Sequence, residues 1–211
     1  IFSSDHGLAV GQHGLMGKQN QYDHSVRMPL VMCGPGLEPG RRIDALVYLH
    51  SLFATTCDLA GIPVPEPVEF ASLVPLLSGT GGVLHDAVFG SYKSFQRMVR
   101  TERYKLIVYP VAGRSQLFDL EQDPWERENL IDEPAVADRA KALRRRLERL
   151  QAEVGDPLDL DAPVQASFAG RRRSPTAGRE VAPDDDGVFE LKPADAVVSG
   201  RLVYQPDRDN L

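Results

Sequence analysis

The pattern of apolar and polar positions divides the chain into regions with different rhythms. In the first region, Ile1–Ser3 is typical of the end of a strand, and Pro29–Cys33 of a buried strand stopped by glycine and proline. From Tyr48 to Ala60, apolar side chains recur on one helical face, and Gly61 follows as a helix terminator. Strand, polar loop, strand and helix in this order predict part of an α/β domain.

Four short runs that are typical of strands follow one another closely in the next region. They span Ala87–Ser91, Arg97–Thr101, Lys105–Tyr109 and Gln116–Leu120. Turn-forming residues separate them, Glu102-Arg103 between the second and third runs and Gly113-Arg114 between the third and fourth. This rhythm predicts an antiparallel meander.

A long helix is predicted after the meander, from Pro134 to Val154. Its apolar residues recur at spacings of four and three: Val136, Ala140, Leu143, Leu147, Leu150 and Val154. Asp132 or Glu133 is placed to cap its start, and Gly155 to end it. We expect this helix to pack on one face of the sheet, with a two-stranded coiled coil as the alternative.

Three parts are therefore predicted along the chain, in an α/β fold class. Residues 1–82 form the C-terminal part of an α/β domain, and residues 83–155 form a small antiparallel sheet with one long amphipathic helix. Residues 156–211 are rich in Pro, Asp and Arg and predict an irregular tail, with a late strand over Val197–Tyr204.

Composition narrows the classes of function. The 211 residues include 24 Lys and Arg against 30 Asp and Glu, a formal net charge of −6 that disfavours non-specific binding to nucleic acid. No apolar run approaches the roughly 20 residues of a membrane span. Two cysteines, Cys33 and Cys57, are too few for a disulfide scaffold. The sequence leaves the oligomeric state and the localisation open.

The polar loop after the first strand carries the candidate chemistry. Asp5 and His6 follow a strand end and offer a hard oxygen and a nitrogen to a divalent metal, although Asp5 could instead cap a turn and His6 bind a backbone carbonyl. Lys18, which lies among glycines, is a compact positive charge for an oxyanion or else a solvated surface lysine. His13 could donate a proton or hold the loop by hydrogen bonds.

Taken together, these segments resemble the sulfatase family of the alkaline phosphatase-like superfamily, over roughly residues 1–155. The resemblance is to the C-terminal portion of the enzyme. The matching segments are Ser4-Asp5-His6-Gly7, Gly11-Gln12-His13-Gly14, Gly17-Lys18, His24-Ser25-Val26-Arg27-Met28-Pro29-Leu30, Tyr104-Lys105-Leu106-Ile107, Leu117-Phe118-Asp119-Leu120-Glu121-Gln122-Asp123-Pro124 and Glu128-Asn129-Leu130.

The resemblance implies a mechanism and a set of site residues. Sulfatases attack sulfur with a formylglycine made from a Cys/Ser-x-Pro-x-Arg motif, assisted by a divalent cation that is usually calcium. By position, Asp5 and His6 match metal ligands, and Lys18 matches a catalytic lysine that contacts sulfate and the leaving oxygen. Lys18 and His13 are the expected substrate-binding residues, and the expected substrate is a small-molecule or carbohydrate sulfate ester.

One departure from the family pattern is decisive. The chain contains no Cys/Ser-x-Pro-x-Arg motif, because Cys33-Gly34-Pro35-Gly36-Leu37 has Leu where Arg is needed. The nucleophile and the first acidic metal ligands of the family lie N-terminal to the matched segment. We therefore expect a fragment that is inactive alone. Two alternatives remain open: a phosphonate monoester or phosphodiester hydrolase of the same superfamily, and a non-catalytic module that binds sulfated sugars or a partner chain.

Overall fold

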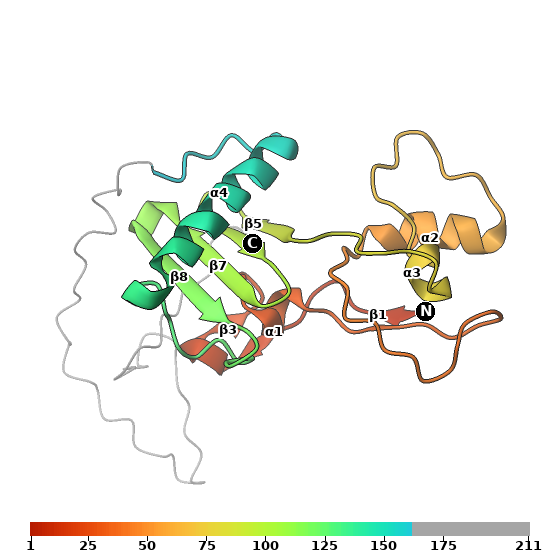
Figure 1. Cartoon of the computed structure of the whole chain (residues 1–211), viewed down its shortest axis with the longest axis horizontal. Helices are drawn as coiled ribbons and strands as arrows, with labels where there is room; N and C mark the ends of the chain where they lie inside the picture. Colours follow the sequence, from red (N-terminus) through yellow and green to blue (C-terminus); the bar gives the residue numbers. More distant parts are fainter. Residues whose placement is uncertain (162–211) are drawn as a thin grey trace, which may run out of the picture.

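The computed structural model describes residues 1–161, which form two lobes (Figure 1). One lobe contains a four-stranded sheet and the long helix α4, and the other contains α2, α3 and a two-stranded pair. The late strand expected over Val197–Tyr204 lies outside the described residues. Within residues 1–161, no helix is both long and apolar enough to cross a bilayer.

The predicted antiparallel meander is confirmed. Its strands are β5 (Val88–Tyr92), β6 (Gln96–Arg100), β7 (Tyr104–Tyr109) and β8 (Arg114–Asp119), paired in sequence order. At the β6–β7 turn, the Thr101 amide donates to the Tyr104 carbonyl at 2.9 Å. A 3-10 turn, η2 (Pro110–Ala112), and Gly113 in the left-handed region with φ 59° connect β7 to β8.

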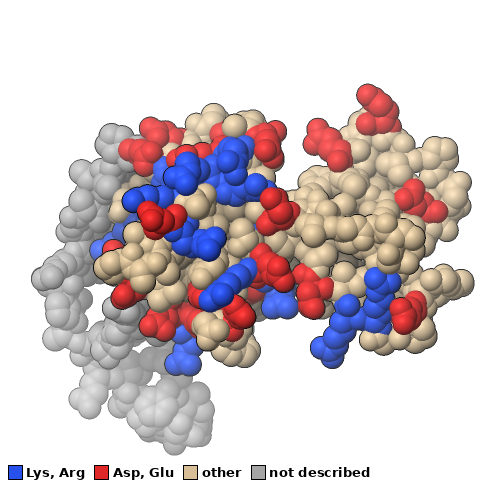
Figure 2. All heavy atoms as spheres, in the orientation of Figure 1, with Lys and Arg blue, Asp and Glu red and all other residues tan. Residues whose placement is uncertain are grey.

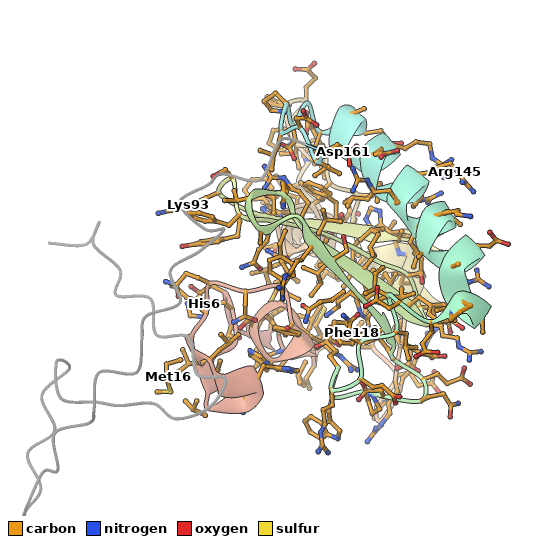
Figure 3. The ribbon with its side chains drawn as sticks, turned by 90° about the vertical axis from the view of Figure 1, so that its left-hand side faces the viewer. His6, Met16, Lys93, Phe118, Arg145 and Asp161 are labelled. Atoms are coloured by element: carbon orange, nitrogen blue, oxygen red, sulfur yellow. The ribbon has the colours of Figure 1, made fainter. Side chains whose placement is uncertain are left out.

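Both faces of this sheet are covered. Alternate residues of a strand point to opposite faces, so Leu106 and Val108 of β7 join the cluster under α4, while Ile107 joins a second cluster on the other face. That second cluster includes Tyr22 and Phe118, and the segment that carries Tyr22 comes from the N-terminal region. Figure 3 shows α4 on one side of the sheet and the N-terminal segment on the other.

The long helix packs as predicted but begins differently. α4 (Ala137–Glu153) buries Leu143 and Leu147 completely or nearly so, and half-buries Leu150. The expected side-chain cap from Asp132 or Glu133 is wrong: a 3-10 turn, η3 (Pro134–Val136), precedes the helix, and the Val136 amide donates to the Glu133 carbonyl at 3.1 Å. Pro134 has no amide hydrogen, so one fewer donor needs a cap.

The end and the outer face of α4 also follow the sequence pattern. Gly155 takes the left-handed conformation that ends it, with φ 66°. The outer face carries basic side chains, which gather over the helix in Figure 2. Arg144 is paired there with Glu148 and Asp161, each at 2.8 Å. Such partly exposed pairs add little to stability.

The other lobe departs from the predicted burial. β1 (Phe2–Ser3) pairs antiparallel with β4 (Leu30–Val31), so that Phe2 lies opposite Val31. The buried strand expected over Pro29–Cys33 is shorter and largely exposed, with Val31 60% exposed. β4 pairs with β1 along one edge, and within the described residues no strand lies along its other edge.

The predicted helix after the second strand is confirmed as α2 (Ser51–Ala60), ended by Gly61 with φ 66°. Its buried side chains, however, are Ser51, Ala54 and Thr55, while the apolar face carrying Phe53 and Leu59 is exposed. The small residues pack because the Thr55 hydroxyl accepts a hydrogen bond from the Leu73 amide at 2.8 Å, next to the short helix α3 (Val74–Ser78).

Candidate active site

The polar loop from Ser4 to Arg27 is more ordered than its composition predicts. A hairpin joins β2 (Ala9–Val10) to β3 (Met16–Gly17) through the 3-10 turn η1 (Gln12–Gly14), and one helical turn follows as α1 (Asp23–Val26). Positive φ values at Gly11 and Gly14, 111° and 69°, allow the chain to reverse between the two strands. The hairpin therefore returns the chain at Lys18 to the strand end that carries His6.

Asp5, His6 and Lys18 converge on one atom. The Lys18 ammonium donates to His6 Nε2 at 2.7 Å, and Asp5 Oδ2 lies 3.3 Å from the same nitrogen. His6 Nδ1 lies 2.8 Å from the Gly7 carbonyl, which can only accept a hydrogen bond. These contacts assign Nδ1 as the donor to the Gly7 carbonyl and Nε2 as the acceptor for Lys18.

The backbone around His6 is held by a close approach at Gly7. The Gly7 amide donates to the Ser25 carbonyl at 2.9 Å, and a Cβ atom at Gly7 would lie 1.9 Å from the His24 carbonyl oxygen. Only glycine allows the strand end to lie this near α1. The glycine that ends the Ser4-Asp5-His6-Gly7 segment is therefore required for steric reasons.

These three side chains open into a cleft between the two lobes. The cleft has a volume of about 1340 Å³, and Asp5, His6 and Lys18 line it together with residues of β5 and of the segment before α2. The Asp5 side chain is 81% exposed and the His6 side chain 35% exposed. A solvent-accessible carboxylate, imidazole and ammonium at one point of a cleft can bind an anion, a cation or both.

His13, the other residue singled out from the sequence, does not join them. Its ring stacks on Tyr22, with centroids 3.9 Å apart and planes 6° apart, and it does not line the cleft. Burial lowers the pKa of His13 below its usual 6.5. Its backbone adopts φ 55°, which is uncommon for a residue other than glycine. His13 thus supports the hairpin, and its binding of substrate stays a prediction.

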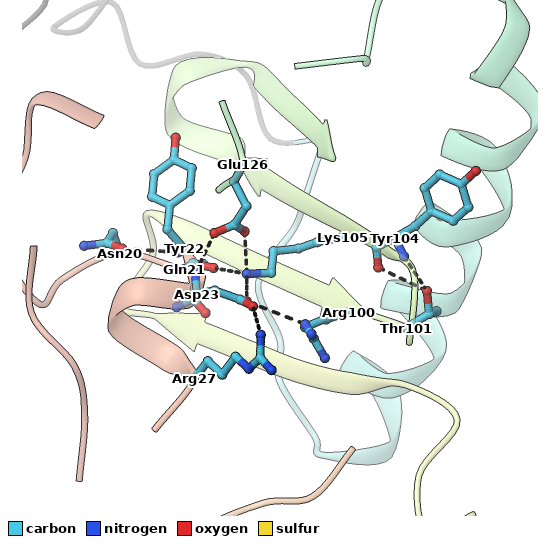
Figure 4. Close-up of polar contacts among 10 residues, drawn as sticks. All are labelled: Asn20, Gln21, Tyr22, Asp23, Arg27, Arg100, Thr101, Tyr104, Lys105 and Glu126. Carbon is cyan, nitrogen blue, oxygen red and sulfur yellow. Dashed lines mark hydrogen bonds and ion pairs between the residues drawn. The ribbon is translucent and has the colours of Figure 1, made fainter. Parts of the chain in front are cut away.

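Sequence reasoning missed a buried ionic cluster beneath the same loop. Lys105 is completely buried, and its ammonium contacts the Gln21 carbonyl at 3.1 Å, Asp23, and Glu126 at 2.5 Å (Figure 4). Glu126 Oε2 also accepts the Asp23 amide at 2.6 Å. The available signal was a charged residue in a strand otherwise rich in apolar residues, Tyr104–Tyr109.

Comparisons with known proteins agree on one family. A family model described as N-sulphoglucosamine sulphohydrolase, C-terminal, matches residues 11–153. The human protein named arylsulfatase K is 33% identical over 144 residues, covering 62% of this chain and 27% of that protein. The choline-sulfatase of Rhizobium meliloti is 38% identical over 141 residues, covering 64% and 27%. The chain spans about a quarter to a third of the length of such curated relatives.

Solved structures give the same result for the fold. A protein named BT4656, solved with its substrate D-glucosamine-2-N,6-O-disulfate, superposes with a TM-score of 0.68 at 28% identity, covering 76% of this chain and 35% of that one. The phosphonate monoester hydrolase of Agrobacterium radiobacter superposes with a TM-score of 0.61 at 29% identity, covering 72% and 34%.

Proposed function

This chain belongs to the sulfatase family, matching its C-terminal portion, and we propose that the protein containing it hydrolyses sulfate esters. The observation that carries the proposal is the convergence of Asp5 and Lys18 on His6 Nε2 in an open cleft. Hydrolysis of an anionic ester needs a positive charge beside the ester oxygens and a site that activates the attacking nucleophile. The substrate class is a small-molecule or carbohydrate sulfate ester, the latter supported by the relative solved with a sulfated glucosamine.

Asp5 and His6 are the proposed ligands of a divalent metal ion. Asp5 Oδ2 and His6 Nε2 lie 3.3 Å apart, so both atoms could bind the same divalent ion. The hydrogen bond from His6 Nδ1 to the Gly7 carbonyl orients Nε2 as such bonds orient metal-ligating histidines.

Further ligands must come from elsewhere. Among residues 1–161, no group of three or more His, Cys, Asp or Glu side chains is arranged to hold a metal ion. When bound, calcium would polarise the oxygens of the sulfate group. We therefore expect the isolated chain to bind calcium weakly, and calorimetric titration showing tight, stoichiometric binding by it would contradict this assignment.

Lys18 is the proposed catalytic residue. Its ammonium is a compact charge on a flexible stem, so it can leave His6 Nε2 and hold an oxygen of the sulfate group. Nε2 of His6 is an acceptor for the ammonium in this structure and would hold the metal ion when one is bound. The positive charge of Lys18 would then offset the negative charge that develops on the leaving oxygen.

A formylglycine outside this chain is the proposed nucleophile: its oxygen would bond to sulfur as the bond from sulfur to the ester oxygen breaks and the alcohol leaves. Since the chain has no Cys/Ser-x-Pro-x-Arg motif, we expect it to be inactive by itself. A second candidate, a phosphonate monoester hydrolase, is favoured by the superposition on the Agrobacterium radiobacter enzyme of that name. The two candidates differ in the ester that is cleaved faster.

The decisive experiment uses the complete protein that carries this chain. It should hydrolyse 4-nitrophenyl sulfate faster than the 4-nitrophenyl ester of phenylphosphonate. Asp5→Ala should lose both bound metal and turnover, whereas Lys18→Ala should retain the metal and lose about 10²–10³-fold in kcat. Lys141→Ala, at an exposed site on α4, is the matched control. Full activity of Lys18→Ala, or faster cleavage of the phosphonate, would overturn the proposal.

A further inference from the structure

We propose that Lys105 is a positioning residue, which fixes the segment Gln19–Asp23 on the sheet so that Lys18 reaches His6. The inference concerns the geometry of the loop. It rests on the proposed function only for its consequence in catalysis. Lys105 lies on β7, and its Cα partner across the sheet is Phe118 on β8. Both belong to the sheet lobe, whereas Lys18 directly follows β3 in the N-terminal loop.

The Lys105 ammonium has three donors, and three oxygen atoms surround it. They are the Gln21 carbonyl, Asp23 Oδ1 and Glu126 Oε1 (Figure 4). The first two belong to the N-terminal loop, and the third belongs to the turn after β8. The Gln21 carbonyl and Asp23 Oδ1 accept hydrogen bonds from the ammonium, and Glu126 Oε1 forms an ion pair with it, all at a residue with no solvent exposure. An apolar side chain at this position could fill space but could not bind the loop at two points.

Other contacts connect this anchor to Lys18. The Asn20 amide donates to the Lys18 carbonyl at 2.8 Å, and the Asn20 side chain accepts from the Tyr22 amide at 3.1 Å. The Gln96 side chain on β6 donates to the Gln19 carbonyl at 3.3 Å. The backbone on the C-terminal side of Lys18 is therefore tied to the sheet within a few residues of its side chain. Loss of the Lys105 contacts removes the most buried of these ties.

The two faces of the sheet separate this role from general stability. Lys105 serves the face that holds the N-terminal loop, while Leu147 of α4 is completely buried against the opposite face. A variant at Leu147 weakens the sheet lobe without touching the loop. A variant at Lys105 should weaken the lobe and also displace Lys18. Comparing the Leu147 and Lys105 variants therefore distinguishes an effect on the position of Lys18 from an effect on the stability of the fold.

The test reads the imidazole of His6 directly, by ¹⁵N NMR of the 211-residue chain labelled on histidine, without divalent metal. His6→Gln assigns the signals. The wild type should show a proton on Nδ1 and an Nε2 shift typical of a hydrogen-bonded acceptor. Lys18→Met supplies the shift of His6 without its donor. Lys105→Met should give the same His6 signal as Lys18→Met, although Lys18 is intact.

The controls make each outcome decisive. Leu147→Ala should lower Tm and leave the His6 signal unchanged. Glu126→Gln, which keeps Lys105 but weakens one contact, should move the signal part of the way and serves if Lys105→Met does not fold. A wild-type His6 signal in Lys105→Met would overturn the inference. If Lys105→Met does not fold, a wild-type His6 signal in Glu126→Gln would overturn it instead. The inference would also fail if Leu147→Ala changed the His6 signal as much as Lys105→Met does. Because no turnover is measured, failure here is distinct from failure of the proposed function.

Discussion

Removal of the Lys105 ammonium should destabilise the protein chiefly through Glu126. In Lys105→Met, Asp23 keeps Arg100 at 3.5 Å and Arg27 at 3.8 Å, whereas Glu126, which is 2% exposed, loses its cationic partner. Breaking one partner of a buried ion pair costs about 3–5 kcal/mol in the free energy of unfolding, since an uncompensated charge stays buried. Urea denaturation followed by circular dichroism measures this loss.

Adding Glu126→Gln to Lys105→Met should recover about 1–3 kcal/mol of that loss. The glutamine carries no charge, and its side-chain carbonyl can still accept the Asp23 amide that Glu126 accepts at 2.6 Å. The double variant should therefore be more stable than Lys105→Met alone. If the two single losses simply add, the cost of a buried, unpaired carboxylate is not the cause.

The pH dependence gives an independent check on the same residue. Burial raises the pKa of Glu126 above its ordinary 4.5, against the opposing effect of Lys105. Without Lys105 the pKa of Glu126 should rise further. At pH values between the ordinary and the raised pKa, Glu126 then binds a proton in the folded state but not in the unfolded state. Stability then increases as pH falls. The deficit of Lys105→Met relative to wild type should shrink from pH 7 to pH 5, and a constant deficit would refute the reasoning.

Three further predictions concern other parts of the described chain. Leu147→Ala should cost about 2–5 kcal/mol in urea denaturation, because Leu147 is completely buried, whereas exposed Lys141→Ala should change little. Gly7→Ala should lower Tm by the equivalent of about 1–3 kcal/mol, because its Cβ meets the His24 backbone, while Gly34→Ala, with open space around it, serves as control. Burial lowers the pKa values of His13 and His24, so the unfolded state binds more protons below about pH 6.5, and Tm should fall as the pH is lowered toward 5. His13→Asn should reduce this dependence of Tm on pH, because asparagine tolerates the left-handed backbone at this position and does not titrate.

The sheet and the long helix could be predicted because their contacts are local. Each strand from β5 to β8 pairs with its neighbour in sequence, and α4 follows with an uninterrupted apolar stripe. The buried face of α2 could not be predicted in the same way. Periodicity finds the apolar face that carries Phe53 and Leu59, but the packed face is made of small residues around Thr55. Close approach and a hydrogen bond to Leu73 decide which face packs.

The candidate site also contains residues that the sequence predicts and one that it does not. Asp5, His6 and Lys18 were predicted from a family resemblance, and the structure brings their side chains to one point. Lys105 was not singled out, because its partner Asp23 lies 82 positions away and no local pattern connects the two. The polar composition of the loop also concealed that it covers a face of the sheet. Tyr22 is the buried loop residue in this contact, and Leu15 and Val26 pack against the same cluster.

A buried ionic cluster at this position argues for a direct role of the C-terminal sheet in the site. Well-packed apolar side chains stabilise an interface at least as well as a buried ion pair, so stability alone does not require Lys105. Apolar packing, however, tolerates sliding, whereas three oxygen atoms around one ammonium fix both distance and direction. The loop that carries Lys18 is the element fixed in this way. The sheet therefore acts as the rigid support on which the position of the proposed catalytic lysine depends.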